Sequence, residues 1–134
     1  MIKAKIMAPI EQVWEYFTMP SHITQWNAAS DDWHTTNASN DLVEGGRFSL
    51  RMEAKDGSFG FDFSGTYTLV KQNSEIHYTL DDQRKVEIVF SAENGETNVM
   101  QSFEPEQQNP VELQQMGWQA ILDNFKKYAE KMVK

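Results

Sequence analysis

The chain contains no cysteine in its 134 residues. This absence excludes disulfide bonds, thiol catalysis and cysteine-based zinc sites, and it fits a reducing cytoplasm. No apolar run approaches the roughly 20 residues that cross a bilayer. The opening residues Met1 to Ile6 have no hydrophobic segment of a signal peptide. We therefore expect a cytoplasmic protein that does not engage a membrane.

Positive charge is also scarce. Twelve lysines and arginines stand against twenty aspartates and glutamates, which gives a formal net charge of −8. A field of that sign repels phosphate backbones, and no basic stripe offsets it locally. We expect no nucleic-acid partner, and we interpret the charge as a source of solubility.

The sequence lacks the common signatures of catalysis. No serine stands in a nucleophile elbow, no glycine-rich loop resembles a phosphate cradle, and no His-Glu helix pattern suggests a metal. Gly45-Gly46 precedes an expected strand rather than a helix and therefore indicates a turn. We assign no catalytic residue, no metal and no cofactor.

What is present is typical of one globular domain spanning 1–134. The length permits a substantial core, and 40% hydrophobic with 24% charged residues is an ordinary globular composition. Ile2, Ala4 and Ile6 alternate with lysines, which predicts a strand. A helix opening at Ala8-Pro9 is expected next, and a second short helix over Ser21–Trp26. Residues 27–40 are expected to form a structured loop with at most a short strand at 33–35.

From Gly45 onward, alternation of apolar and polar residues predicts an antiparallel meander. One long strand is expected over 59–70, with Gly65, Tyr67 and Leu69 in one phase. The glycine inside it indicates a bulge or a close approach by another group. Asn94-Gly95 is a strong hairpin signal.

The last element is a helix over about Asn109 to Met132. Asn109 is expected as its N-cap, Pro110 at the first helical position, and Glu112 as the partner in a capping box. Its apolar stripe is widened by Trp118 and Leu122. Because a sheet with one inner face needs a cover, we expect this helix to pack across it, in an α+β fold.

Several stretches also carry a family resemblance that is collinear over nearly the whole chain. The sequence resembles the bacterial AHSA-type proteins of the SRPBCC (START-like) superfamily, which are similar to the C-terminal domain of the activator of the ninety-kilodalton heat-shock chaperone ATPase. The matching stretches are Ala8-Pro9, Val13-Trp14, Trp26-Asn27, Asp31-Asp32-Trp33-His34, Gly45-Gly46-Arg47-Phe48, Asp56 to Phe63, Gly65-Thr66-Tyr67 and Gly117-Trp118 through Leu122.

The resemblance implies a helix-grip fold: a curved antiparallel sheet of six to seven strands, two short helices and a long C-terminal helix. It further implies a cavity between that helix and the sheet, suited to an apolar or amphipathic small molecule. Members of the superfamily include lipid carriers, hormone receptors and aromatic cyclases. The eukaryotic chaperone activator has a separate N-terminal domain that engages the chaperone, with no counterpart in these 134 residues.

Aromatic residues are the first candidates for a site, because aromatic walls with a few polar groups are typical of ligand pockets. The alternative is ordinary core packing. We expect ligand access above all at the tryptophans of the irregular segment and the last helix. The aromatic candidates are Trp26, Trp33, Phe48, Phe61, Phe63, Tyr67, Tyr78 and Trp118.

Polar candidates form two groups. Asp32 and His34 share a face if their segment is extended, and they could orient a ligand or act as acid and base. The alternative is a loop whose carboxylates bond backbone N–H groups. Gln101 lies on an inward phase with the Tyr67 and Tyr78 hydroxyls. It is either paired internally or open to a ligand, because a buried amide without a partner is costly.

Three functions follow, in order. The first is a binding protein that holds an apolar or aromatic small molecule. The second is a protein-interaction module of the chaperone-activator kind, with a chaperone as its partner. The third is a cyclase or hydrolase that uses Asp32 and His34. We expect a monomer or weak dimer, because Lys3 and Lys5 discourage pairing at the edge of the first strand.

Overall fold

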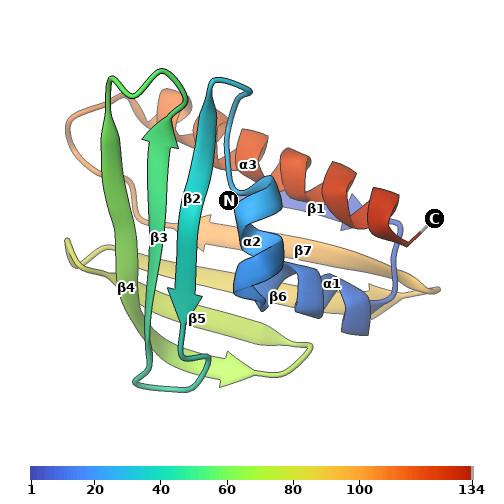
Figure 1. The fold of residues 1–134 in the computed structure, drawn as a ribbon. Coiled ribbons are helices and arrows are strands. Elements are labelled where there is room, and N and C mark those ends of the chain that lie inside the picture. Colours follow the sequence, from blue (N-terminus) through green and yellow to red (C-terminus); the bar gives the residue numbers. More distant parts are fainter. Residues whose placement is uncertain (134) are drawn as a thin grey trace.

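Seven strands form one antiparallel sheet in the computed structural model, which describes residues 1–133 (Figure 1). Their order is β1-β7-β6-β5-β4-β3-β2, so the meander from β2 to β7 is continuous and β1 joins β7. The predicted α+β helix-grip fold is confirmed. The strands are β1 (Ile2–Ile6), β2 (Trp33–Asn40), β3 (Arg47–Ala54), β4 (Gly60–Lys71), β5 (Glu75–Leu80), β6 (Lys85–Glu93) and β7 (Glu96–Phe103).

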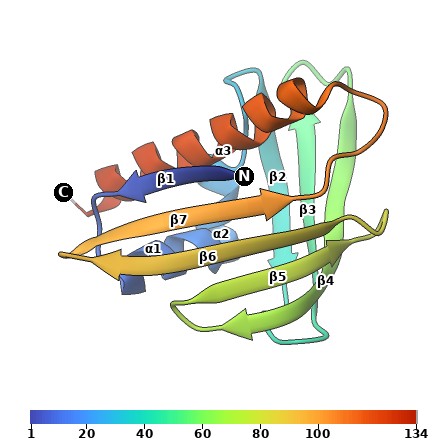
Figure 2. The same ribbon diagram turned by 180° about the vertical axis from the view of Figure 1, so that it is seen from behind.

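Three helices lie on one side of this sheet. The two short helices, α1 (Ile10–Thr18) and α2 (Pro20–Trp26), carry the chain from β1 at one edge to β2 at the other. The long helix α3 (Val111–Met132) runs beside β1, and the sheet bends so strongly that β2 and β3 stand across the direction of β6 and β7 (Figures 1 and 2). The bend encloses the space beneath α3.

The buried residues of α3 lie in its C-terminal half, at Leu122, Phe125 and Ala129. Phe125 is fully buried there, and its ring lies 5.1 Å from that of Phe17 and 4.8 Å from that of Trp26, between ring centroids. The N-terminal turns of α3 are mostly exposed. The helix therefore packs tightly at one end and leaves space beneath its middle.

The free edge of β1 is covered by side chains of α3. Lys126 donates to the carbonyl of Lys5 at 2.7 Å, and Gln119 donates to the carbonyl of Lys3 at 3.2 Å. An edge strand exposes unpaired backbone groups, and these contacts satisfy some of them. The helix thus closes the edge that the lysine side chains were expected to protect.

Gly65 is present because another strand approaches it closely. A Cβ atom there would lie 2.5 Å from the carbonyl oxygen of Thr79 and 3.1 Å from a ring carbon of Phe48. The bulge is elsewhere in β4, where the register with β5 shifts between Tyr67 and Leu69. This shift reverses the phase, so Val70 packs on the core, and the prediction that Leu69 continues the inward phase is wrong.

Two further boundaries differ from the sequence prediction. Residues 33–40 form a full strand, β2, instead of a loop with a short strand. Its alternation is hidden because it is rich in Thr, Asn and Ser and is bulged between Thr35 and Asn37. Helix α2 begins at Pro20, one residue earlier than expected, because proline fits the first position of a helix.

The predicted capping box of α3 is absent. Pro110 occupies the N-cap and no side chain caps the helix. Asn109 instead directs its backbone N–H and its side-chain amide to the Glu106 carboxylate, at 2.8 and 3.0 Å. Within residues 1–133, no helix is both long enough and apolar enough to span a membrane.

Candidate functional site: a cavity beneath the long helix

A partly open cavity of about 300 Å³ lies between the helices and the concave face of the sheet. This volume is at the lower end of the range of roughly 300–1,000 Å³ that small-molecule sites occupy. Most of its lining is aliphatic or aromatic. The aliphatic wall consists of Ile23, Leu50, Met52, Ile76, Ile88, Ile121 and Leu122.

The structure brings most of the predicted site residues together around this cavity. They come from α2, β3, β4, β5, β7 and α3, elements far apart in the sequence. Sheet pairing explains part of the convergence, because Phe48 is opposite Gly65 and Tyr67 is opposite Tyr78. The predicted residues that line the cavity are Trp26, Phe48, Phe61, Phe63, Tyr67, Tyr78, Gln101 and Trp118.

Contacts among these rings fix the walls. The Phe48 ring lies 5.2 Å from Tyr67 and 4.8 Å from Tyr78. Trp118 stacks on Phe103 and meets the edge of Phe63 at 5.9 Å. Aromatic pairs at such distances prefer defined orientations. These ring contacts hold the cavity walls in a defined arrangement.

The segment with the two aspartates lies outside the cavity lining. Asp32 is exposed and its carboxylate accepts a hydrogen bond from the Ser30 hydroxyl. Trp33 packs on Phe59 and Phe61, each with centroids 6.0 Å away. His34 is half-buried on β2 and pairs with Glu53 in the strand register. The cyclase or hydrolase hypothesis needs Asp32 and His34 in the cavity, and this arrangement does not provide that.

Three polar lining residues that were not among the predicted site residues are satisfied within the protein. Thr18 donates to the carbonyl of Trp14 at 2.7 Å, and Asn27 donates to the Thr35 hydroxyl at 3.1 Å. Asn40 donates to the carbonyl of Thr18 at 2.8 Å and to the Tyr67 hydroxyl at 3.2 Å. Because Asn40 lies in a segment predicted as a loop, no alternation marked it as inward-facing.

Two further polar residues of the lining are Tyr78 on β5 and Gln101 on β7. Burial is the main cause that raises the pKa of Tyr78, and nearby Tyr67 raises it further. The charge of Arg84 and a hydrogen bond with Gln101 oppose this shift. Tyr78 is therefore a neutral hydroxyl at physiological pH, and Gln101 is its neighbour in the cavity.

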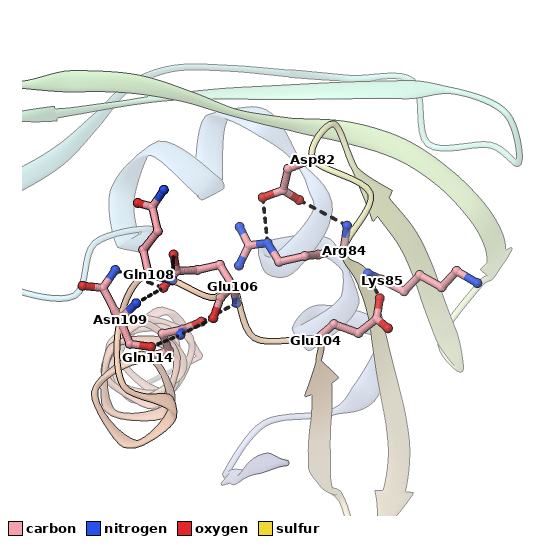
Figure 3. Close-up of polar contacts among 8 residues, drawn as sticks. All are labelled: Asp82, Arg84, Lys85, Glu104, Glu106, Gln108, Asn109 and Gln114. Atoms are coloured by element: carbon pink, nitrogen blue, oxygen red, sulfur yellow. Dashed lines mark hydrogen bonds and ion pairs between the residues drawn. The ribbon is translucent and has the colours of Figure 1, made fainter.

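Arg84 also lines the cavity, at a position between β5 and β6 where no alternation marks a side chain as inward-facing. Its Nε donates to the Asp82 carboxylate at 2.7 Å, and its backbone N–H donates to the other oxygen at 3.1 Å (Figure 3). Gln83, with a φ of 77°, lies between them in the turn. Asp82 therefore fixes the arginine at both the backbone and the side chain.

The loop between β7 and α3 lies at the same end of the sheet (Figures 2 and 3). Glu106 accepts hydrogen bonds from Asn109 and from the backbone N–H of Gln108, and Gln114 donates to the Glu106 carbonyl. Desolvation acts to raise the pKa of Glu106, but the hydrogen bonds from Asn109 and Gln108 and the charge of Arg84 outweigh it and lower the pKa.

A further polar contact involves His22 of α2. Its Nδ1 lies 2.6 Å from the Tyr128 hydroxyl, and its ring meets Tyr16 with centroids 4.9 Å apart. This contact joins α2 to α3. In the part of the chain that the structure describes, no three His, Cys, Asp or Glu side chains gather as a metal site.

Comparison with known proteins gives a family and close structural relatives. Residues 7–130 match the family model described as Activator of Hsp90 ATPase homolog 1-like protein. The solution NMR structure of the AHSA1-like protein from Aeromonas hydrophila is 47% identical, with a TM-score of 0.90, and the match covers 98% of this chain and 92% of that one. A protein from Cytophaga hutchinsonii is 51% identical, with a TM-score of 0.84 and the same coverage.

More distant structures share the fold alone. A protein from Nitrosomonas europaea is 16% identical, with a TM-score of 0.79 over 98% of this chain and 93% of that one. The comparison with curated proteins gave no match.

Proposed function

This chain belongs to the family of proteins like the activator of Hsp90 ATPase homolog 1, and on that premise we propose that it is a small-molecule-binding protein. Its ligand, an apolar or aromatic molecule, would occupy the cavity between α3 and the sheet. The observation that carries this proposal is the cavity of about 300 Å³ with walls of aliphatic and aromatic side chains. Transfer of apolar surface from water into such walls is favourable by about 25 cal/mol per Å².

The preformed walls support the same proposal. Phe48, Tyr78 and Tyr67 hold one another in place, so a ligand need not order them on binding. Binding to a preorganised site avoids part of the entropy loss that otherwise weakens affinity.

The test is a binding screen with lipids, polyketides and flavonoids, read by tryptophan fluorescence and thermal unfolding. Trp26 and Trp118 line the cavity and report on its contents. Leu50→Phe places a larger side chain in the cavity wall and so reduces the space for a ligand. It should abolish binding of every compound that binds the wild-type protein. Leu69→Phe makes the same change at a position paired with His77, outside the core, and should leave binding intact. Equal binding by both variants would place the ligand elsewhere and refute the proposal.

A second candidate function, a protein-interaction module of the chaperone-activator kind, is favoured by one observation. The first turns of α3 expose Val111, Leu113 and Met116, which are 50, 56 and 68% accessible. Exposed apolar side chains that gather on one element are typical of protein contacts. The test measures the ATPase rate of a bacterial chaperone of this class with and without the protein. An increase that Leu113→Ser with Met116→Ser removes supports this function, and an unchanged rate at saturating protein rejects it.

A further inference from the structure

Arg84 is the one charged residue in the cavity lining, within residues 1–133. Its side chain is 23% exposed and its Nε is occupied by Asp82. In the same described part of the chain, its Nη1 and Nη2 atoms make no hydrogen bond. An arginine held at Nε keeps its terminal fork free for a planar anion such as a carboxylate.

The other polar groups of the cavity divide into two sets. The side chains of Thr18, Asn27 and Asn40 donate hydrogen bonds to acceptors within the protein. Tyr78 and Gln101 instead contact each other, and the charge of Arg84 acts on the Tyr78 hydroxyl. Arg84 is therefore the charged group that a ligand can meet in the lining, beside the polar Tyr67, Tyr78 and Gln101, while α2 and α3 present apolar side chains such as Trp26 and Leu122.

The surrounding acids do not replace a ligand at this fork. Asp82 and Glu106 both lie outside the cavity lining. Asp82 bonds the Nε edge and the backbone of Arg84, and Glu106 is held by donors of its own loop (Figure 3). A neutral apolar ligand that displaced water from the cavity would leave the Nη donors without partners, which is unfavourable. A ligand with an anionic end would satisfy them.

We propose that the cavity takes an apolar monocarboxylate whose carboxylate binds the Nη fork of Arg84 and whose hydrocarbon or aromatic body lies between α3 and the sheet. This inference rests on the proposed binding function and names its ligand class. The Tyr78 hydroxyl and the Gln101 amide line the same cavity and are further polar groups that the ligand can meet.

The experiment compares two acids with their uncharged methyl esters. Naphthylacetate represents an aromatic body and dodecanoate an aliphatic one, and each affinity is measured by titration calorimetry near neutral pH. Because hydrogen bonds to a charged group are strong, we expect the wild-type protein to bind at least one acid about tenfold or more tightly than its ester. The aromatic and aliphatic arms identify which body the cavity prefers.

Variants then locate the preference. Arg84→Gln should weaken binding of the acid and leave that of the ester unchanged, so that the preference disappears. Arg84→Lys keeps the charge without the fork and should give an intermediate preference. Arg51→Gln is the matched control, because Arg51 pairs with Glu53 and Asp62 outside the cavity lining. It removes the same charge and should keep the preference.

Three results would overturn the inference. Equal binding of acid and ester by the wild type, or a preference retained in Arg84→Gln, rejects the anionic anchor while the binding function stands. Failure of both pairs to bind rejects the ligand class, and the broader screen then decides the binding function separately. The wild-type comparison needs no variant, so it remains decisive even if Arg84→Gln does not fold.

Discussion

The indole of Trp118 lies nearly parallel to the Phe103 ring, with centroids 4.7 Å apart and planes inclined by 9°. The stack joins the exposed end of α3 to the last strand, beside the cavity. Loss of such a pair costs about 0.5–1.5 kcal/mol beyond the buried area. Trp118→Leu should therefore lower the free energy of unfolding in urea and weaken ligand binding. Trp118→Phe keeps an aromatic partner, and equal losses in both variants would show that stacking is unimportant.

Gly65 and Gly117 form a matched pair for alanine substitution. A Cβ at Gly65 meets the Thr79 carbonyl oxygen at 2.5 Å, whereas nothing lies within 4 Å at Gly117. Gly65→Ala should destabilise the protein by about 1–3 kcal/mol through overpacking. Gly117→Ala should stabilise α3 by about 0.5–1 kcal/mol, because alanine favours a helix interior. Urea unfolding measures both, and a neutral Gly65→Ala would contradict the close approach of β5.

The contact of His22 with Tyr128 should contribute to the packing of α2 on α3. The hydroxyl is 2.6 Å from Nδ1, so its removal in Tyr128→Phe should cost about 0.5–1.5 kcal/mol. Tyr16→Phe is the control, since within residues 1–133 the Tyr16 hydroxyl makes no hydrogen bond. Thermal unfolding of the two variants should separate them, and equal midpoints would argue against the contact.

Acid stability should depend on Asp81. Hydrogen bonds from Arg47 and Ser64 lower the pKa of Asp81 from 3.8 to about 2. A carboxylate with a lowered pKa stabilises the fold above its unfolded pKa, and that contribution is lost as the pH falls from about 4 to about 2. Asp81→Asn should therefore flatten the decline of the urea midpoint in this interval.

The control for the acid experiment is Asp31→Asn, which removes the same charge at an exposed position. The urea midpoint of this variant should decline with falling pH as steeply as that of the wild type. A full acid-dependent decline in Asp81→Asn would assign the effect to other carboxylates.

The fold could be predicted from the sequence because its elements have strong periodicities. The alternation in β6, with Val86, Ile88 and Phe90 buried, is unambiguous, and the family resemblance is confirmed by the match over 7–130. The errors have local causes. The edge strand β2 is polar, so its sequence shows no clear alternation of apolar and polar residues. In β4, a bulge between Tyr67 and Leu69 reverses which side chains face the core, and simple alternation does not predict such a reversal. Asn109 hydrogen-bonds to the Glu106 carboxylate and does not cap α3 as predicted.

The site was predictable only where inward phase and aromatic character coincide. Phe48, Tyr78 and Gln101 stood on clear alternations and line the cavity. Arg84 follows a turn whose direction depends on the positive φ of Gln83, which no pattern encodes. Asp32 and His34 were predicted as site residues because a carboxylate and an imidazole can act as acid and base. In the structure neither residue lines the cavity. That the lining residues bind a ligand stays a prediction.

The most direct measurement of that prediction uses the seven isoleucines of the chain as internal probes. In protein labelled with ¹³C only at isoleucine δ1 methyl groups, titration with the acid that binds, naphthylacetate or dodecanoate, should shift the methyls that line the cavity and give them intermolecular NOEs. The methyls of Ile2, Ile6 and Ile10 lie outside the lining and should keep their positions. The responding set should be Ile23, Ile76, Ile88 and Ile121. Binding that perturbs Ile2, Ile6 and Ile10 instead, or that leaves all seven methyls unmoved, would contradict the placement of the ligand beneath α3.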